Sequence, residues 1–115
     1  MQYLDRAGSM GQVAAKGGAF TFAGTVWLWN GDSPWHFVSL PEEIADEIED
    51  LTVGRTRGFG SVRVEVTSDG LTWRTSLFPD RKSGTYLLPL KKQVRQQLGC
   101  EAGTQVRLSL RILED

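Results

Sequence analysis

The sequence has few of the residues that build disulfides and most metal sites. Its 115 residues include one cysteine, Cys100, and one histidine, His36. This excludes an internal disulfide, a cysteine-rich zinc site and a histidine cluster. No stretch approaches the roughly 18 consecutive apolar residues of a membrane span, and no secretory leader opens the chain. We therefore expect a cytoplasmic protein without a metal ion, a cofactor or a membrane span.

The chain also lacks a large net charge. The formal charge of −1 argues against purely electrostatic binding of nucleic acid. The charge is nevertheless uneven, because residues 1–53 carry 2 basic and 8 acidic side chains, whereas residues 54–115 carry 11 basic and 6 acidic ones. One face of the molecule can therefore be positive while the whole is nearly neutral.

Hydrophobic alternation begins only near residue 19. Residues 1–18 lack periodicity and are rich in glycine, which is typical of a flexible tail. Residues 19–115 are expected to form a single domain, since the length and the 40% apolar share suit one core. Alternating apolar residues predict strands in FTFAGTVWLW, WHFVSL, SVRVEVTS, TYLLP and TQVRLSLRIL.

The dipeptide Asp69-Gly70 predicts a tight β-hairpin. Folding the chain about it sets a complete register between SVRVEVTS and the strand that follows. The register places Glu65 opposite Arg74 on the outer side. The inward pairs of this register are Val66 with Trp73, Val64 with Thr75 and Val62 with Leu77.

Two short amphipathic helices are expected. The first covers roughly residues 41–51, with Ser39 as its cap and Glu42 as the capping-box partner. Its apolar positions are spaced i, i+4 and i+7 and are Ile44, Ile48 and Leu51. The acidic residues around them are interpreted as a solvated helix face. The second helix is VRQQL, and Gly99 supplies its left-handed end.

The order strand, helix, strand occurs twice along the chain. FVSLPEEIADEI leads to SVRVEV, and YLLPLKKQVRQQLG leads to TQVRLSL. The aligned apolar positions are Ile44 with Val94, Ile48 with Leu98 and Val62 with Val106. This repeat predicts a β-barrel made of two related halves, each carrying a short helix.

Two resemblances agree with this architecture. The segment VRQQLGCEAGTQV resembles swapped-hairpin domains of the AbrB and MazE type, which usually dimerise from one such unit. Residues 19–113 resemble the DUF1905 family of small bacterial domains of unknown function. That resemblance is carried by FTFAGTVWLW, WHFVSLPEEIADEI, GFGSVRVEVTSDGLTWRTSLFPD and KSGTYLLPLKKQVR. It implies a mainly β fold, an AbrB-like double-split β-barrel in a single chain, and we expect a monomer.

The first candidate site is cationic. It combines the loop GRTRGFG with the stretch TWRTSLFPDRKSGTYLLP, and its cations are Arg55, Arg57, Arg74, Arg81 and Lys82. Guanidinium groups bind phosphate or carboxylate in bidentate fashion, and Phe59 and Tyr86 could stack on a base or ring. This predicts a binding module for an anionic ligand or nucleic acid. The alternative is a solvated surface, on which Glu65 pairs with Arg74 and Asp80 with Arg81.

The second candidate site is aromatic. Trp27 and Trp29 share one side of their strand, opposite Phe22 and Leu28, and Trp35 follows in the next strand. Both sides of that strand are apolar, so either it is covered on both sides or one side is an exposed patch. Residue statistics favour burial. An exposed patch would indicate a small-ligand or protein-interaction module.

No catalytic arrangement is visible. His36 lies between two aromatic residues, with no nucleophile placed beside it by spacing. Cys100 follows a predicted helix C-terminus, where the helix dipole disfavours the thiolate. The sequence also lacks a phosphate-binding glycine motif and paired catalytic carboxylates. We therefore expect a protein that is not an enzyme.

Overall fold

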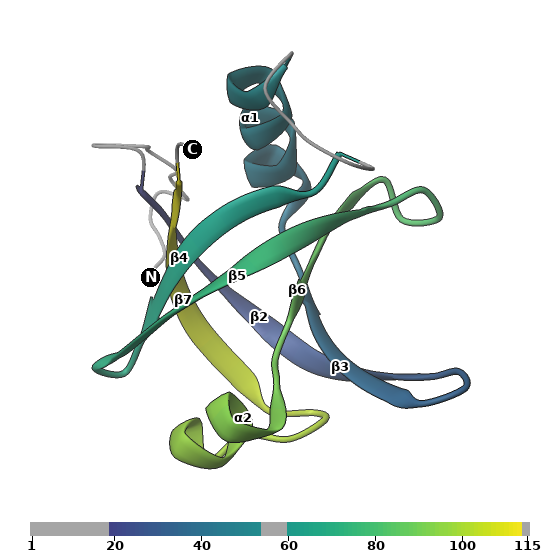
Figure 1. Ribbon diagram of the computed structural model, residues 1–115, viewed down its shortest axis with the longest axis vertical. Coiled ribbons are helices and arrows are strands. Elements are labelled where there is room, and N and C mark those ends of the chain that lie inside the picture. Colours follow the sequence, from purple (N-terminus) through teal and green to yellow (C-terminus); the bar gives the residue numbers. More distant parts are fainter. Residues whose placement is uncertain (1–18, 54–59, 114–115) are drawn as a thin grey trace.

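The computed structural model describes residues 19–53 and 60–113 (Figure 1). The described strands form a closed antiparallel barrel in the order β2-β3-β6-β5-β4-β7. The elements are β2 (Ala19–Asn30), β3 (Pro34–Ser39), α1 (Glu42–Thr52), β4 (Val62–Ser68), β5 (Leu71–Asp80), β6 (Thr85–Pro89), α2 (Lys92–Leu98) and β7 (Gln105–Ile112). The expected mainly β barrel with two short helices is confirmed. The expected tail, residues 1–18, lies outside the described residues.

Two strands close the barrel by changing partners along their length. In β2, residues 19–25 pair with β7 and residues 26–30 pair with β3. In β5, residues 71–77 pair with β4 and residues 78–80 pair with β6. The barrel therefore consists of two four-stranded sheets that share β2 and β5.

The pairing pattern is symmetric between the two halves of the chain. Exchanging β2 with β5, β3 with β6 and β4 with β7 leaves every pair of neighbouring strands unchanged. Leu40 N–H donates to Tyr86 O at 3.0 Å, and Leu90 N–H donates to His36 O at 2.9 Å. The two bonds are equivalent, because exchanging the halves of the chain replaces Leu40 by Leu90 and Tyr86 by His36. The pairing thus supports two related halves, whereas the likeness to AbrB-type domains stays a prediction.

The core lies inside the barrel and under α1. The β4–β5 register is the one that Asp69-Gly70 predicts, including Val66 opposite Trp73. Both turn residues have positive φ, 50° at Asp69 and 83° at Gly70, as a hairpin turn of this length requires. The largest fully buried side chains are Phe20, Ile48, Leu77, Leu88, Leu108, Leu110, Val26, Val38, Val64 and Val66. Trp73 packs against this core, as expected.

The start of α1 differs from the prediction. No side chain caps the helix, which begins at Glu42 after Pro41. Ser39 belongs to β3, and its hydroxyl oxygen accepts a hydrogen bond from Trp27 Nε1 at 2.9 Å. The capping-box prediction is therefore wrong, because the serine is used between strands.

The inward face of α1 also differs at its end. Ile44 and Ile48 are buried as predicted, but Leu51 is exposed and Thr52 is buried in its place. The Thr52 hydroxyl donates to the Ile48 carbonyl at 2.8 Å, which satisfies the buried polar group. The hydroxyl partner inside the helix explains how a threonine replaces the expected leucine.

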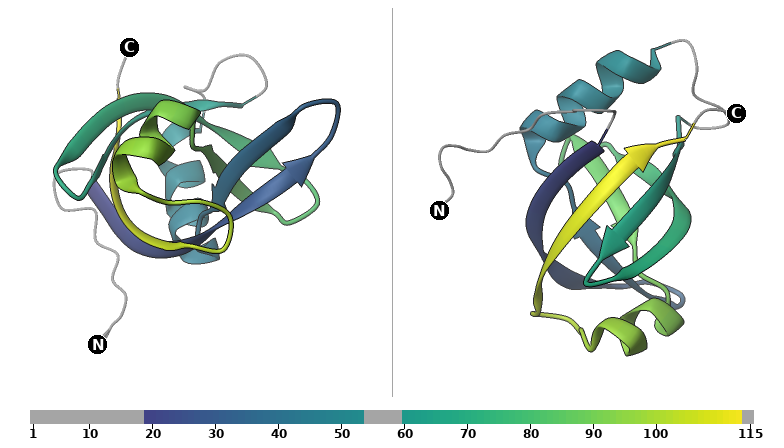
Figure 2. Two further views of the ribbon diagram at one scale, coloured as in Figure 1. Left: turned by 90° about the horizontal axis from the view of Figure 1, so that it is seen from below. Right: turned by 90° about the vertical axis from the view of Figure 1, so that its left-hand side faces the viewer.

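The two helices lie at opposite ends of the barrel (Figures 1 and 2). Gly99 ends α2 in the left-handed conformation, with φ 67°, as predicted. Within the described ranges, no helix is long and apolar enough to cross a membrane. The helices leave the outer sides of both sheets uncovered, and these sides carry the candidate sites.

Candidate functional site

The structure separates the predicted cationic residues. Arg74 lies on the outer side of β5, where its Nε is 3.5 Å from Glu65 Oε2. Arg81 and Lys82 lie in the turn between β5 and β6. Seven residues along an extended strand place Arg81 roughly 23 Å from Arg74. The remaining predicted members, Arg55, Arg57 and Phe59, lie outside the described residues.

The β5–β6 turn is organised by a carboxylate. Asp80 Oδ2 accepts hydrogen bonds from the Ser83 hydroxyl at 2.6 Å and from the Ser83 N–H at 3.2 Å. These bonds hold the pKa of Asp80 below its ordinary value. Asp80 is therefore engaged by Ser83, and the expected Asp80–Arg81 ion pair does not form.

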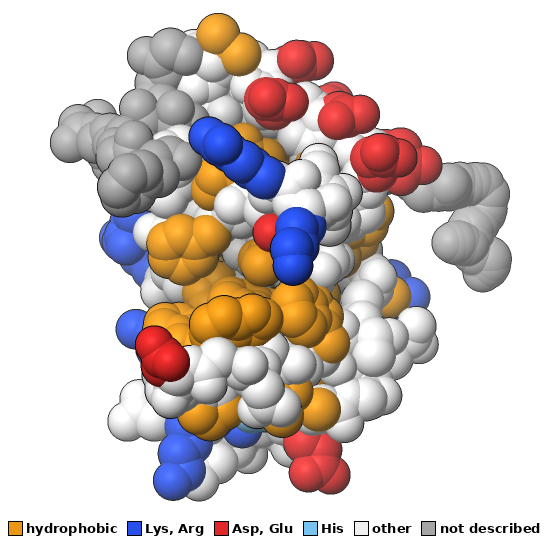
Figure 3. All heavy atoms as spheres, turned by 90° about the vertical axis from the view of Figure 1, so that its right-hand side faces the viewer, with side chains coloured by type: hydrophobic (Ala, Val, Ile, Leu, Met, Phe, Trp, Pro, Cys, Tyr) orange, Lys and Arg blue, Asp and Glu red, His pale blue; other side chains and the backbone are white. Residues whose placement is uncertain are grey.

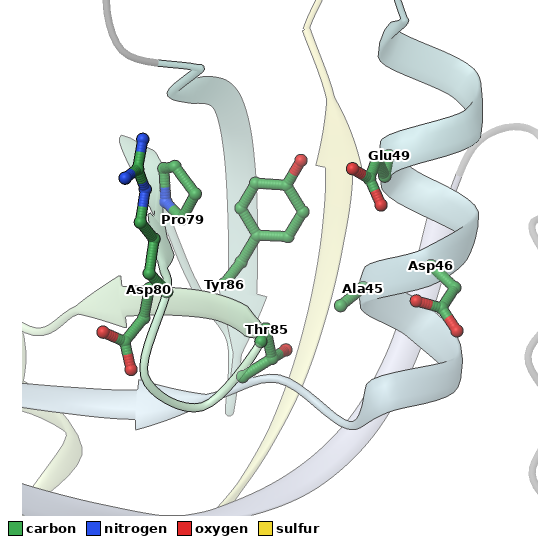
Figure 4. A pocket seen from close by; sticks show the side chains of 9 residues that line it. Ala45, Asp46, Glu49, Pro79, Asp80, Thr85 and Tyr86 are labelled. Atoms are coloured by element: carbon green, nitrogen blue, oxygen red, sulfur yellow. The ribbon is translucent and has the colours of Figure 1, made fainter.

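Tyr86, the second predicted stacking residue, is 9% exposed. It lines a pocket of about 190 Å³ between α1 and the β5–β6 hairpin, where its ring lies between Pro79 and the helix (Figure 4). Burial raises the pKa of its hydroxyl. The pocket is lined by three carboxylates and one guanidinium, those of Asp46, Glu49, Asp80 and Arg81. Its charge does not suit an anion.

The predicted tryptophans lie at paired outward positions of β2 and β3. Figure 3 shows a continuous band of hydrophobic side chains on this side of the molecule. Trp29 pairs with Trp35 across β2 and β3, and the exposed fractions of these two side chains are 47% and 44%. Phe78, on β5, is 44% exposed. We call this surface the outer aromatic face, and its members are Trp27, Trp29, Trp35, Phe37, Phe78 and Leu87. The burial that residue statistics favoured for the strand of Trp27 and Trp29 is wrong for Trp29.

The aromatic rings of this face are held in place by specific contacts. Trp35 and Phe37 stack with centroids 5.9 Å apart and planes 7° apart, and Trp27 lies 5.5 Å from Phe37. The Trp29 ring lies over Gly31, where an added Cβ would be 1.9 Å from the ring. Side chains fixed in this way lose little further entropy on binding, which favours recognition of a partner.

The symmetry of the barrel provides an internal comparison for the outer aromatic face. The Trp27–Phe37 pair corresponds to Phe78–Leu87 in the second half, so an apolar pair stands at that position in both. Two residues nearer the hairpin tip, Trp29–Trp35 corresponds to Asp80–Thr85. The corresponding hairpin of the second half, β5–β6, thus forms with a polar pair at the equivalent position. From this comparison we expect that the fold does not require the tryptophan pair.

Sequence reasoning missed a second surface, on the other sheet. The outer side of β4, β5 and β7 carries, among the described residues, four arginines and one carboxylate, which are Arg63, Arg74, Arg107, Arg111 and Glu65. We call it the arginine face. Glu65 Oε1 accepts from Arg111 at 2.7 Å, and this bond, with a smaller contribution from Arg74, lowers the pKa of Glu65. Charged residues occupy the outward positions of both VRVEV and TQVRLSLR in the sequence. Only the β4–β7 pairing shows that these positions form one surface.

The one histidine and the one cysteine lie in surroundings that favour their neutral forms. Burial, with a smaller contribution from the charge of Arg95, lowers the pKa of His36. Cys100 is buried, and burial raises the pKa of its thiol, which disfavours the thiolate nucleophile. Within residues 19–53 and 60–113, no three His, Cys, Asp or Glu side chains are grouped to hold a metal ion.

These features define a small single-chain β-barrel with two related halves and two different outer surfaces. The chain belongs to the family described as a domain of unknown function, DUF1905, whose model matches residues 22–110. The match includes both halves of the barrel and both hairpin tips, and it confirms the expected family. No curated protein matches the chain.

Proposed function

We propose that this protein is a non-enzymatic binding module that holds a protein partner on its outer aromatic face. The observation that carries the proposal is the exposed Trp29–Trp35 pair, whose counterpart in the second half is Asp80–Thr85. Exposed tryptophan pairs that the fold does not require are typical of interaction sites.

The partner would be recognised through the side chains of the face. At the Trp29–Trp35 pair β2 and β3 pair with each other, and nearer the barrel Phe37 pairs with both β2 and β6. An apolar side chain of the partner would pack on the rings, where the central contacts of protein interfaces are usually made. Neither Trp29 nor Trp35 donates its indole N–H to any described residue, and in this proposal both donate to carbonyl groups of the partner.

The edge of the face indicates the charge of the partner. Arg81 and Lys82 lie in the turn that follows Phe78, and Figure 3 shows basic side chains beside the hydrophobic band. A carboxylate next to the apolar anchor would complement them. The acidic face of α1 lies beyond this turn and disfavours a nucleic acid. In this proposal, Arg81 and Lys82 keep their anion-binding role as the rim of the aromatic site.

A peptide-display selection tests the proposal without a known partner. A library of random peptides is selected on the wild-type protein and depleted on the Trp29→Asp/Trp35→Thr variant. The variant carries the residues of the second half at the equivalent positions, so its fold is expected to persist. We expect the enriched peptides to combine an aromatic or aliphatic anchor with a carboxylate.

Binding of an enriched peptide is then measured on labelled protein by NMR. The proposal predicts shifts of the Trp29 and Trp35 indole N–H signals, and weaker binding by the Arg81→Gln/Lys82→Gln variant. A selection in which no peptide distinguishes wild type from the tryptophan variant would contradict it. Shifts of the same indole signals by a single-stranded oligonucleotide, with no effect of peptides, would assign the face to nucleic acid.

A further inference from the structure

The geometry points to a second binding site, in which the arginine face holds the phosphate backbone of a double-stranded nucleic acid. This inference does not rest on the proposed protein partner, because it concerns the opposite sheet. The face is formed by β5, β4 and β7, which are consecutive neighbours in the barrel. Its four arginines outnumber the one carboxylate between them, and the described part of the face has an excess of positive charge.

The arginines differ in how far they are already engaged. Glu65 lies directly opposite Arg74 on one side and Arg111 on the other, and it contacts both. Arg63 and Arg107 make no ion pair with any described residue. The nearest other carboxylate by register is Asp69, in the turn beyond the strand end. Among the described residues, two guanidinium groups thus have no ion-pair partner, and two share a single one.

A row of hydroxyl groups crosses the same face. The Thr67 and Thr72 hydroxyl oxygens are 3.0 Å apart, and the Thr21 hydroxyl donates to Ser109 Oγ at 3.3 Å. The pairing places these residues side by side on β5, β4, β7 and β2. Hydroxyl groups donate to phosphate oxygens, and they position a nucleic acid without reading its sequence.

The spacing of the charges favours a polymer over a small anion. Arg74 and Arg111 converge on the single carboxylate of Glu65 and form one cationic cluster. Arg107 lies four residues from Arg111 along β7, roughly 13 Å, and Arg63 lies six register positions from Arg107 across the β4–β7 pair, roughly 20 Å. Cations spread over that length do not converge on one phosphate. They match a repeating anion, and guanidinium groups are well suited to phosphate.

The side chains of the face favour a duplex over a single strand. Single-strand binding usually depends on aromatic rings on which unpaired bases stack. Among the described outward positions of β4, β7 and residues 71–77 of β5, there is no aromatic side chain. A surface of cations and hydroxyl groups contacts the sugar-phosphate backbone of the nucleic acid and not its bases. Binding would therefore be independent of the nucleic-acid sequence and strongly dependent on salt.

The test is a fluorescence titration of the full chain with a short mixed-sequence DNA duplex at several salt concentrations. Four arginines less one carboxylate leave three positive charges on the face, which would engage about three phosphates. Three engaged phosphates predict a slope of about −3 for log affinity against log salt, and an affinity loss of about 40-fold between 50 and 200 mM. The Arg63→Gln/Arg107→Gln variant should reduce the magnitude of the slope by about 2. Lys92→Gln, a charge change on α2 outside the face, should leave the slope unchanged.

Glu65→Gln gives a test in the opposite direction. Removing this carboxylate frees Arg74 and Arg111, so we expect it to strengthen duplex binding severalfold. The inference is overturned if the duplex does not bind at about 50 mM salt, or if Lys92→Gln weakens binding as much as the arginine variant. It is equally overturned if a single strand binds more tightly and shifts the indole signals of the outer aromatic face.

Discussion

Gly24 shows how one residue allows β2 to serve two sheets. It lies just before the point where β2 leaves β7 and pairs with β3. A Cβ added at this position would be 2.6 Å from Val38 Cγ1 in the core, a distance that forces a shift of a fully buried side chain. The close approach of β2 to β3 therefore depends on a glycine.

We expect Gly24→Ala to lower the free energy of unfolding by about 1–3 kcal/mol, as overpacking does in other cores. Equilibrium denaturation checks this, with Ala23→Ser, an exposed neighbour, as the control. An unchanged unfolding midpoint in Gly24→Ala would show that Val38 moves without cost.

Asp80 makes the stability of the β5–β6 turn dependent on pH. Hydrogen bonds from Ser83 lower the pKa of Asp80 in the folded protein below its unfolded value of about 3.9. A lowered folded pKa contributes stability that is present above the unfolded pKa and is lost as pH falls through the folded pKa. We predict that wild type is more stable than Asp80→Ala at neutral pH and that this difference shrinks below about pH 4.

Thermal unfolding of both proteins across the acid range measures the difference. The pKa of Glu65 is also lowered, so its titration contributes to the pH dependence of stability. Both proteins retain Glu65, and its contribution therefore cancels in the difference between wild type and Asp80→Ala. A stability gap that stays constant with pH would mean that the carboxylate charge has no part in the turn.

Single residues also show where local reasoning fails. Ser39 has the spacing of a helix cap, but it lies in a strand and accepts from Trp27, which is 12 residues earlier. Leu51 fits the helical period, but Thr52 is buried because its hydroxyl bonds within the helix. Tertiary contacts determine which of two possible partners a side chain uses, and the local sequence pattern does not contain these contacts.

The β4–β5 hairpin is the element most fully determined by its own sequence. Its turn type, inward stripe and Glu65–Arg74 pair all follow from Asp69-Gly70 and the alternation around it. The change of partner within β2 and β5 could not be predicted in the same way, because it joins residues far apart in the chain. The arginine face was missed for the same reason.

Gly70 has φ 83°, a conformation that residues with a Cβ rarely adopt. Gly70→Ala is expected to cost about 1–2 kcal/mol, whereas Asp69→Asn should be nearly neutral because asparagine tolerates positive φ. Urea denaturation of both variants checks the pair. Equal stability of Gly70→Ala and wild type would mean that the turn adopts another geometry in solution.

At the scale of the whole molecule, two related halves carry different surfaces. The repeat predicted the barrel and its two helices, since apolar spacing persists where the halves share a core. The repeat could not predict that Trp29 and Trp35 are exposed, because tryptophan side chains are usually largely buried. Their exposure follows from the position of their pair near the tip of the β2–β3 hairpin.

The most direct measurement is the unfolding free energy of Trp29→Asp/Trp35→Thr, in which the tryptophan pair is replaced by the pair of the second half. If the pair serves binding and not folding, the loss should stay below about 2 kcal/mol, since nearly half of each side chain is already exposed. Phe20→Ala, in the fully buried core, should cost about 3–5 kcal/mol. A loss in the tryptophan variant as large as that of Phe20→Ala would contradict the account and make the outer aromatic face part of the fold.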